Sequence, residues 1–417
     1  MALKFLINSL FRGGAEKQAA ALSRLIPHDA FILLEREVGF APENPRIEFL
    51  SEHTARTSPI LKTLSIRSYA GKMAKLASKG DVVLSFMERA NLVNITAARR
   101  TGHRAVISER ICPSLEFSGL RGMLMKPMIK RLYPEAALII ANSKGVKNDL
   151  EYNFDVPQGK IKVIYNGCDT EGVSKLAVEP LDNGWAEVFK DPVLITSGRL
   201  APAKGHKYLL RIFSRLKKTR PALKLVILGE GGLKAGLIKL AGELKLKVFD
   251  AAKGPLPPEP RDVYFPGFEE NPYKFIARAA VFVFPSLWEG LPNALIEAMA
   301  CGTPVASADC PGGPREILAP DTPIDSGTRT AEQAPYGLLL PLLGEPERRT
   351  PAPGGSAEEV WAAGILEMLD TPGALEKYSL AGSKRAADFE LSRIAALWLE
   401  TLYAPPPAEQ VEINPAS

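Results

Sequence analysis

Four charged side chains have types and spacing that could act on a phosphorylated sugar. Glu289 and Glu297 are separated by seven residues, and Arg199 and Lys204 lie close together earlier in the chain. A guanidinium fork and an ammonium point charge together suit a diphosphate, and carboxylates accept hydrogen bonds from sugar hydroxyls. The four residues therefore predict a site that binds a polyol bearing a phosphate or a diphosphate.

The two glutamates flank the start of an expected helix. The apolar run 281–284 is typical of a strand buried on both faces, and Pro285 ends it. Pro292 suits the first turn of a helix, which Gly302 and Pro304 close. The first glutamate then lies at the carboxyl end of a strand, where open α/β sheets bind ligands. The helix start also offers backbone amides to an anion or a polyol, on Gly290, Leu291 and Asn293.

Arg199 and Lys204 are expected at the same kind of position. Residues 193–196 predict a strand, and the two cations follow it in the loop before the next helix. This arrangement places two fixed positive charges at the carboxyl edge of a sheet. The alternative is that they are two ordinary surface charges.

The sequence around the glutamates resembles the E-x7-E signature of retaining glycosyltransferases of family 4, with Ala-x-Ala-Cys-Gly-Thr-Pro-Val after the second glutamate. The resemblance implies an α/β fold of the GT-B type, in which two Rossmann-like parallel-sheet domains face a central cleft. It also implies that Glu297 holds the ribose hydroxyls of a nucleotide-sugar and that Glu289 acts catalytically on the donor sugar. Arg199 and Lys204, within Gly-Arg-Leu-x-x-x-Lys-Gly, are implied to neutralise the leaving nucleoside diphosphate.

Two further segments are expected to contact the donor. Gly13 and Gly14 lie between a predicted strand at 3–7 and a helix, a turn that lets backbone approach a phosphate closely. They resemble the N-terminal glycine loop of family 4 enzymes, which lies against the donor diphosphate. By the same resemblance Gly267 and Phe268 line the nucleobase pocket. Core packing of Phe268 is the alternative.

The acceptor side is predicted at the end of another strand, 104–108. In many family 4 enzymes a histidine stands there, whereas this chain has Glu109 and Arg110, and His103 precedes the strand. The Ser-Glu-Arg strand end resembles the subgroup that extends undecaprenyl-diphosphate-linked glycans. Glu109 and Arg110 are therefore candidate acceptor contacts, with Arg110 on an acceptor phosphate, and a structural ion pair is the alternative. We assign no catalytic role to His103.

The length of 417 residues suggests two domains. We expect residues 1–170 to form an acceptor-binding domain, 171–190 a polar linker, and 191–385 a nucleotide-sugar-binding domain. The resemblance implies that a last helix, 386–404, crosses back to the first domain. The Pro-rich tail 405–417 is expected to be disordered.

The first 170 residues carry 25 Lys and Arg against 16 Asp and Glu, a net charge of +9. Segments 56–79 and 121–131 concentrate these cations among apolar residues at partly helical spacing. Two interpretations are open: solvated helices that pack on the first sheet, or a cationic, apolar surface that rests on anionic lipid. Aromatic residues are not interleaved with the charges, so no nucleic-acid partner is expected. The apolar positions are Leu61, Leu64, Met73, Leu76, Met123, Leu124, Met125, Met128 and Ile129.

Composition excludes several other classes of protein. Apolar content of 46% and charged content of 24% are those of an ordinary globular protein. No apolar run approaches the ~18 residues of a membrane span, and the N-terminus turns polar too soon for a signal peptide. We therefore expect a cytoplasmic protein, peripheral on the inner face of the membrane. The four cysteines form no C-x-x-C pair, and no Asp-x-Asp metal anchor occurs, so neither a metal nor another cofactor is expected.

The expected activity is transfer of a hexose or N-acetylhexosamine from a nucleotide-sugar, taken as a UDP-sugar, to a lipid-linked glycan acceptor. A UDP-N-acetylglucosamine 2-epimerase is an alternative, because it shares the fold and binds a similar ligand. A non-catalytic lipid-binding scaffold is a third possibility. Release of UDP in the presence of acceptor separates the transferase from the other two.

Overall fold

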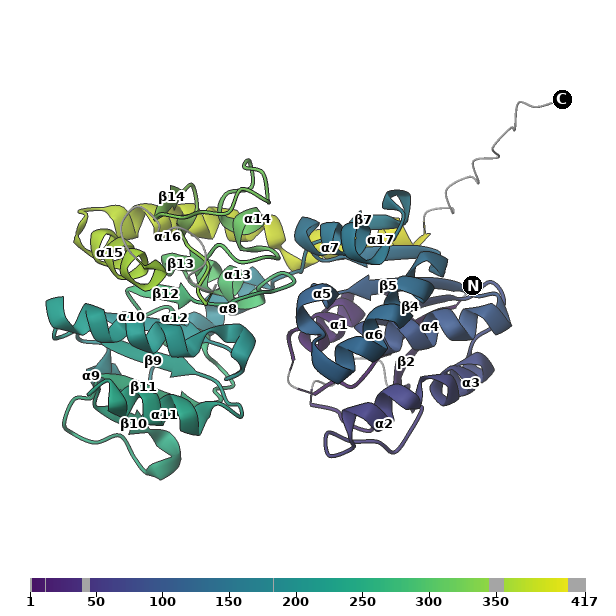
Figure 1. Ribbon diagram of the computed structural model, residues 1–417, viewed down its shortest axis with the longest axis horizontal. Helices are drawn as coiled ribbons and strands as arrows, with labels where there is room; N and C mark the ends of the chain where they lie inside the picture. The colour runs from purple at the N-terminus through teal and green to yellow at the C-terminus, as the bar shows by residue number, and fades with distance from the viewer. Residues whose placement is uncertain (1, 12, 40–45, 183, 345–355, 404–417) are drawn as a thin grey trace.

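The computed structural model describes residues 2–11, 13–39, 46–182, 184–344 and 356–403. Figure 1 shows two α/β lobes side by side, each built on its own sheet. No helix in the described ranges is both long and apolar enough to cross a bilayer. The expected disordered tail, 405–417, lies outside the described residues, so its disorder stays a prediction.

The first sheet is entirely parallel within the described residues and runs in the order β3-β2-β1-β4-β5-β6-β7. Its central strands are mostly short apolar runs, because helices cover both faces of the sheet. The strands of this sheet are β1 (Leu3–Ile7), β2 (Ala30–Leu33), β3 (Ile47–Phe49), β4 (Val82–Phe86), β5 (Arg104–Glu109), β6 (Leu138–Ala141) and β7 (Ile161–Val163).

The second sheet runs in the order β10-β11-β9-β8-β12-β13-β15-β14 and is parallel except for the antiparallel pair β14 and β15. The two sheets share the strand pattern of a doubly wound fold, which extends outward in both directions from a central pair. The strands are β8 (Val193–Ser197), β9 (Lys224–Leu228), β10 (Val248–Asp250), β11 (Val263–Gly267), β12 (Val281–Phe284), β13 (Val305–Ala308), β14 (Glu332–Ala334) and β15 (Gly337–Leu340).

Helices connect most successive strands and cover both faces of each sheet (Figure 1). The first lobe contains α1 (Gly14–Leu25), α2 (Pro59–Leu64), α3 (Ile66–Leu76), α4 (Glu88–Thr101), α5 (Pro113–Glu116), α6 (Gly119–Leu132) and α7 (Lys144–Phe154). The second contains α8 (Thr170–Ala177), α9 (Trp185–Val188), α10 (His206–Thr219), α11 (Lys234–Glu243), α12 (Tyr273–Ile276), α13 (Asn293–Ala300), α14 (Pro314–Leu318), α15 (Ala357–Asp370) and α16 (Ala374–Ala386).

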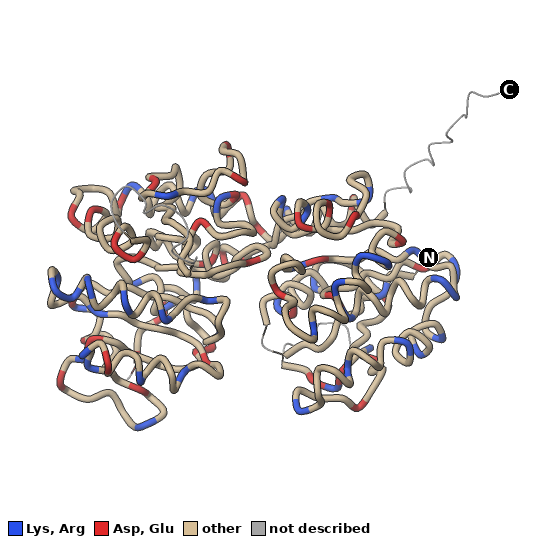
Figure 2. The backbone as a smooth tube through the Cα atoms, in the orientation of Figure 1, with Lys and Arg blue, Asp and Glu red and all other residues tan. Residues whose placement is uncertain are grey.

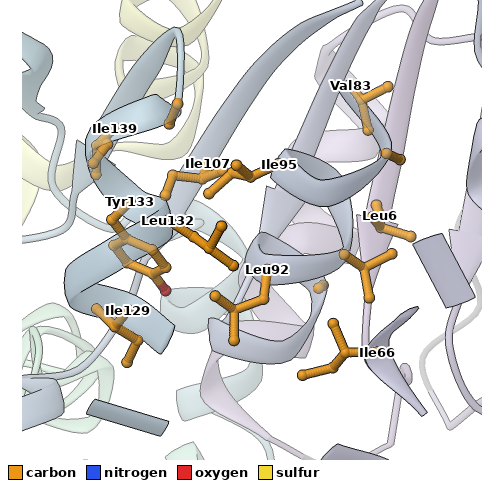
Figure 3. Close-up of a cluster of buried hydrophobic side chains, with 14 of the residues drawn as sticks. Leu6, Ile66, Val83, Leu92, Ile95, Ile107, Ile129, Leu132, Tyr133 and Ile139 are labelled. Carbon is orange, nitrogen blue, oxygen red and sulfur yellow. The ribbon is translucent and has the colours of Figure 1, made fainter. Parts of the chain in front are cut away.

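The core of the first lobe shows how helices α3, α4 and α6 are held on one face of its sheet. Ile66 of α3, Leu92 of α4 and Ile129 of α6 pack with strand residues such as Ile107, all almost fully buried (Figure 3). Burial of such side chains contributes roughly 1.5–3 kcal/mol each. The opposite face of the same sheet is covered by α1 and by a helix from the far end of the chain.

That last helix, α17 (Leu391–Tyr403), belongs to the core of the first lobe although the second lobe precedes it in sequence. Trp398 is fully buried there, with its ring 5.9 Å from that of Phe86. The outgoing and returning chains lie together, because the Cys168 N–H donates to Phe389 O at 2.7 Å and the Leu391 N–H donates to Cys168 O at 2.9 Å. The two lobes are thus joined by a double connection.

The segment 171–190, expected to be a polar linker, is largely helical. It holds most of α8 and all of α9, and Val173 and Trp185 are buried in the core of the second lobe. The prediction of a linker was wrong, because the polar residues of this segment belong to the exposed faces of two short helices. This segment is a packed part of the second lobe.

Candidate active site

The loops that carry the predicted site residues lie where the strand order of each sheet reverses. In the first sheet Gly13 and Gly14 follow β1, which pairs with β4. In the second sheet Arg199 and Lys204 follow β8, and Glu289 follows the neighbouring β12. These switch points at the carboxyl edges are the places where doubly wound sheets bind ligands.

Lys204 and Glu289 form a direct ion pair at this edge. Lys204 Nζ lies 2.5 Å from Glu289 Oε1, and the two side chains are 25% and 12% exposed. The loops that carry them are tied together, since the Leu287 N–H donates to Ala203 O at 2.7 Å. Gly205 allows this approach: its φ is +64°, and a Cβ there would lie 1.9 Å from Pro285 O. The structure therefore joins the predicted catalytic glutamate to one of the two predicted phosphate cations.

Arg199, the other predicted cation, is exposed at the same edge and forms no hydrogen bond or ion pair within the described residues. Its charge acts across the lobes on Glu16, which lies on α1 just after the glycine turn. Burial raises the pKa of the Glu16 carboxyl to about 7, although its own backbone N–H and Arg199 act in the opposite direction. An unpaired guanidinium at the edge of a sheet is available to bind an anion.

The raised pKa of Glu16 predicts a dependence of stability on pH. The folded protein keeps this proton between the ordinary pKa of 4.5 and about 7, whereas the unfolded chain releases it. The contribution to stability is therefore complete below pH 4.5 and is lost as the pH rises through about 7. We expect Glu16→Gln to flatten this part of the profile, measured by urea unfolding at pH 5.5 and 8.5. An unchanged difference between the two pH values in the variant would contradict this assignment.

Glu297 is held by a residue that the sequence did not single out. Lys17 of α1 places Nζ 2.6 Å from Glu297 Oε1 and 2.6 Å from the hydroxyl oxygen of Tyr273. Burial by itself lowers the pKa of the Lys17 ammonium, but the Glu297 carboxylate raises it overall. Each of the two predicted substrate glutamates thus has a lysine partner, and one of these lysines comes from the opposite lobe.

The start of α13 is in contact with the first lobe. Asn166 Nδ2 donates to Leu291 O at 3.1 Å and to Asn293 Oδ1 at 2.5 Å. Asn293 Nδ2 in turn donates to Gly14 O at 3.4 Å, which brings the glycine turn to the helix tip. A Cβ on Gly290 would lie 1.9 Å from Arg110 O, so only glycine permits this approach. The predicted donor residues from both lobes therefore meet at one helix terminus.

A second contact between the lobes lies beside Glu289. Trp288 Nε1 donates to Glu116 Oε2 of α5 at 3.2 Å. In the glycine turn, a Cβ on Gly13 would lie 2.0 Å from Glu16 Oε2, and a Cβ on Gly14 would lie 3.5 Å from Asn293 Nδ2 of the second lobe.

Gly267 is the last residue of β11 on the second lobe, and Phe268 follows it directly. Phe268 is 47% exposed, so core packing, the alternative to a ligand contact, does not describe it. Gly267 has φ +97°, and a Cβ there would lie 2.8 Å from Glu230 Oε1. An exposed aromatic ring at the carboxyl end of a strand can stack on a flat ligand such as a base.

Glu109 and Arg110, the predicted acceptor contacts, are both buried. Glu109 is fully buried; its carboxylate accepts hydrogen bonds from the Tyr133 hydroxyl at 2.6 Å and from the Arg110 N–H at 2.9 Å. Burial, reinforced by the charge of Glu88, raises the pKa of Glu109 well above its usual value. The interior of the lobe surrounds the Glu109 carboxylate in this structure, and its direct contact with an acceptor stays a prediction.

Arg110 is different because its guanidinium is incompletely paired. One terminal nitrogen donates to Asn166 Oδ1 at 2.5 Å, and the other lies 3.4 Å from Ser108 Oγ. Nε has no hydrogen-bond partner among the described residues. Burial lowers the pKa of Arg110 to about 10, against the opposing effect of Glu109. A buried guanidinium with an unused N–H, beside the α13 tip, can receive an anion.

The histidine that precedes β5 has internal partners. His103 Nε2 lies 2.8 Å from Asn94 Oδ1 and Nδ1 lies 2.5 Å from Thr101 Oγ1. Burial lowers the pKa of His103 to about 4, so the ring is neutral at neutral pH. Among the described residues no group of three or more His, Cys, Asp or Glu side chains is arranged to hold a metal ion.

Two family models account for most of the chain. A model described as "Glycosyltransferase Family 4" matches residues 12–172, and one described as "Glycosyl transferases group 1" matches residues 179–328. With the two doubly wound sheets and the charged residues gathered between them, these matches define the class. The chain belongs to the glycosyltransferases of this family, as the motifs around Glu289 implied.

One relative matches nearly all of the chain, and a second matches two thirds of it. The N-acetylgalactosamine-N,N'-diacetylbacillosaminyl-diphospho-undecaprenol 4-alpha-N-acetylgalactosaminyltransferase of Campylobacter jejuni is 34% identical over 402 residues, 94% of this chain and 97% of that protein. An uncharacterized glycosyltransferase of Methanocaldococcus jannaschii is 33% identical over 67% of this chain and 66% of its own.

Solved structures match the fold. Anabaena HepE, crystallised in complex with UDP-glucose, superposes with a TM-score of 0.70 at 19% identity, covering 96% of this chain and 99% of that one. Sucrose-phosphate synthase from Thermosynechococcus elongatus gives 0.71 at 18% identity, covering 97% and 98%. At these identities the likeness concerns the fold alone, and it confirms the expected GT-B architecture of two Rossmann-like domains.

Proposed function

We propose that the protein is a retaining glycosyltransferase that moves a hexose or N-acetylhexosamine from a UDP-sugar to a lipid-diphosphate-linked glycan. The observation that carries this proposal is the Lys204–Glu289 ion pair at the switch point of the second sheet, beside the unpaired Arg199. A cation for a leaving diphosphate, Lys204, and a carboxylate for the sugar, Glu289, are thus in direct hydrogen-bond contact. The proposal assigns Glu289, Arg199 and Lys204 to the chemical step.

The donor half of the reaction follows from the charges at this edge. Lys204 and Arg199 neutralise the diphosphate as the bond to the anomeric carbon breaks, and the α13 tip adds backbone amides. Glu289 lies next to Lys204, where its charge stabilises the positive charge that develops on the sugar. Glu297 holds the ribose, while Gly267 and Phe268 line the base. The acceptor hydroxyl attacks from the same face and gives its proton to the departing phosphate oxygen, so the configuration is retained and no metal is required.

The acceptor half rests on Arg110 and on the Campylobacter jejuni relative, whose name specifies a diphospho-undecaprenol glycan. Arg110 contacts the acceptor diphosphate through its unused guanidinium N–H. Glu109 positions Arg110 from beneath, because its carboxylate accepts the Arg110 backbone N–H. The proposed division is an acceptor-binding domain at 1–170 and a donor-binding domain at 191–385.

A lipid acceptor implies contact with a membrane, and the first domain offers a suitable surface. Exposed apolar side chains occur on α2 and at the start of α6, with Leu64 69% and Met123 74% exposed. Figure 2 shows Lys and Arg distributed over the helices of this domain. Both helices lie near the carboxyl edge of the sheet, since Lys62 of α2 pairs with Glu35 after β2, and α6 follows the carboxyl end of β5 by way of α5.

Several residues of the two basic segments are buried and cannot belong to this surface. Lys62 is buried against Glu35, with 2.5 Å between Nζ and Oε2, so it is a structural cation. Met73, Met125 and Ile129 are fully buried in the core of the domain. The segment 56–79 forms two helices, α2 and α3, which are divided at Ser65. The proposed lipid-facing apolar set is therefore Ile60, Leu61, Leu64, Leu120, Met123 and Leu124.

Charging this surface should weaken membrane binding. We expect Leu64→Glu and Met123→Glu each to lower the affinity for vesicles containing phosphatidylglycerol about tenfold. Each change replaces an apolar side chain that would enter the lipid surface with a carboxylate that the anionic lipid repels. Cosedimentation with vesicles measures the effect. Val178→Glu, at a 79% exposed position of the second lobe, is the matched control and should bind like the wild type. Wild-type binding by both variants would rule out this surface.

The proposed reaction is tested by supplying a panel of UDP-hexoses and UDP-N-acetylhexosamines with an undecaprenyl-diphosphate-linked glycan in vesicles. Release of UDP that depends on the acceptor, with a product heavier by one sugar residue, is the expected result. Epimerised sugar formed without acceptor would replace the proposal by the 2-epimerase reaction. Binding of the lipid glycan with neither product would leave a scaffold.

A further inference from the structure

Lys17 and Glu297 form an ion pair between the two domains that the motifs identified in the sequence do not account for. The two residues are 280 positions apart and come from α1 of the first domain and α13 of the second. Lys17 is the only lysine of α1, and it lies one turn beyond the glycine turn. Its side chain is 44% exposed and that of Glu297 16%, so one side of the pair faces solvent.

The unused hydrogen-bonding capacity of the pair consists of one donor and one acceptor. The Lys17 ammonium has three N–H groups, of which one contacts Glu297 Oε1 and one the Tyr273 hydroxyl. Glu297 Oε2 accepts no hydrogen bond within the described residues. The pair therefore presents an N–H beside a carboxylate oxygen, and neighbouring hydroxyls on a cis-diol can satisfy both at once.

Displacement of Lys17 by the ligand is the less favourable arrangement. A neutral diol that replaced Lys17 would leave a partly buried carboxylate and ammonium without their opposite charges, which is costly. A diol that adds to the pair leaves both charges compensated and gains two charge-assisted hydrogen bonds. We infer that Lys17 is a donor-binding residue, and that it clamps the ribose cis-diol of the nucleotide together with Glu297.

This inference rests on the proposed function, because it assigns a second contact to the ribose subsite of the donor. Lys17 and Glu297 belong to different domains, so the same ribose would contact both domains at once. Nucleotide binding then requires that α1 and α13 stay together, and the ribose becomes a bridge across the cleft. Tyr273, which also holds the Lys17 ammonium, is a positioning residue for it.

The test is a calorimetric titration of UDP and of 2′,3′-dideoxyuridine diphosphate into the wild type and Lys17→Met. We expect Lys17→Met to weaken UDP binding roughly tenfold or more, the usual effect of losing a hydrogen bond to a charged group. For the dideoxy nucleotide, which lacks the diol, the variant and the wild type should differ less than about twofold. Lys239→Met is the matched control, because it removes an exposed lysine of α11 and should change neither affinity.

Three results would overturn the inference. Equal or tighter UDP binding by Lys17→Met would show that the lysine merely competes for Glu297. An equal loss for both nucleotides would place its effect away from the diol. Loss of UDP binding in Glu297→Ala but not in Lys17→Met would leave the proposed function intact and remove the clamp alone. A wild-type protein that binds no nucleoside diphosphate would instead overturn the proposed function, and thermal midpoints of all variants exclude unfolding as the cause.

Discussion

Glu289→Gln is expected to lower turnover about a hundred- to a thousandfold, equivalent to ~3–4 kcal/mol on the barrier. The substitution keeps the shape of the side chain and removes its charge. Two effects then act together: the developing positive charge on the donor sugar loses its counter-charge, and Lys204, 2.5 Å away, loses its partner. Initial rates of UDP release at saturating donor and acceptor measure the change.

Two comparisons make this prediction specific. Glu187→Gln is the matched control, because Glu187 forms an exposed ion pair with Lys190 at 2.8 Å, and such pairs contribute little. Lys204→Met should impair turnover by a similar factor to Glu289→Gln. In the double variant the two losses should be far from additive, since the residues act as one unit. A Glu289→Gln enzyme that retains more than about a tenth of wild-type turnover would remove Glu289 from the chemical step.

Trp398→Ala is expected to lower the free energy of unfolding by about 3–5 kcal/mol, the usual cost of truncating a large buried aromatic residue. Trp398 is fully buried between α17 and the first sheet, against Phe86. The loss also releases the helix that returns from the second domain, so transfer activity should fall together with stability. Urea unfolding followed by the fluorescence of the remaining tryptophans measures the first effect, and UDP release measures the second.

The same helix provides the control for this prediction. Leu397 is 39% exposed, and we expect Leu397→Ala to cost less than about 1 kcal/mol because little apolar area is buried there. Trp398→Phe should keep most of the stability, since Trp398 Nε1 has no hydrogen-bond partner among the described residues. If Trp398→Ala unfolded like the wild type, α17 would not be a structural part of the first domain in solution.

Short-range patterns in the sequence determined much of the fold. The strands β1 and β12 have the expected bounds, because each is an apolar run ended by a turn or a proline. The short strands β3 and β10 were not foreseen, since three residues carry too little periodicity to be recognised. The family could be recognised from sequence because its motifs combine residue types with fixed spacing around one strand and one helix.

For the predicted site, the residues could be chosen from sequence but their contacts could not. Glu289 and Lys204 could be chosen from sequence, because each lies in a loop after a recognisable strand of one domain. Their direct contact could not be predicted, since it depends on how β8 and β12 pair. For the basic helices, the sequence identified the charged segments but could not tell buried Lys62 from its exposed neighbours.

The sequence by itself determined the class of protein, several of the central strands, and the loops that carry the charged residues. Only the tertiary structure decided which charges meet. It buried Glu109 beneath Tyr133, and it brought Lys17, which resembles any solvated lysine of an amphipathic helix, to Glu297 of the other domain. The physical reason is that periodicity and turn chemistry act over a few residues, whereas these partners are chosen by the packing of two domains folded from distant parts of the chain.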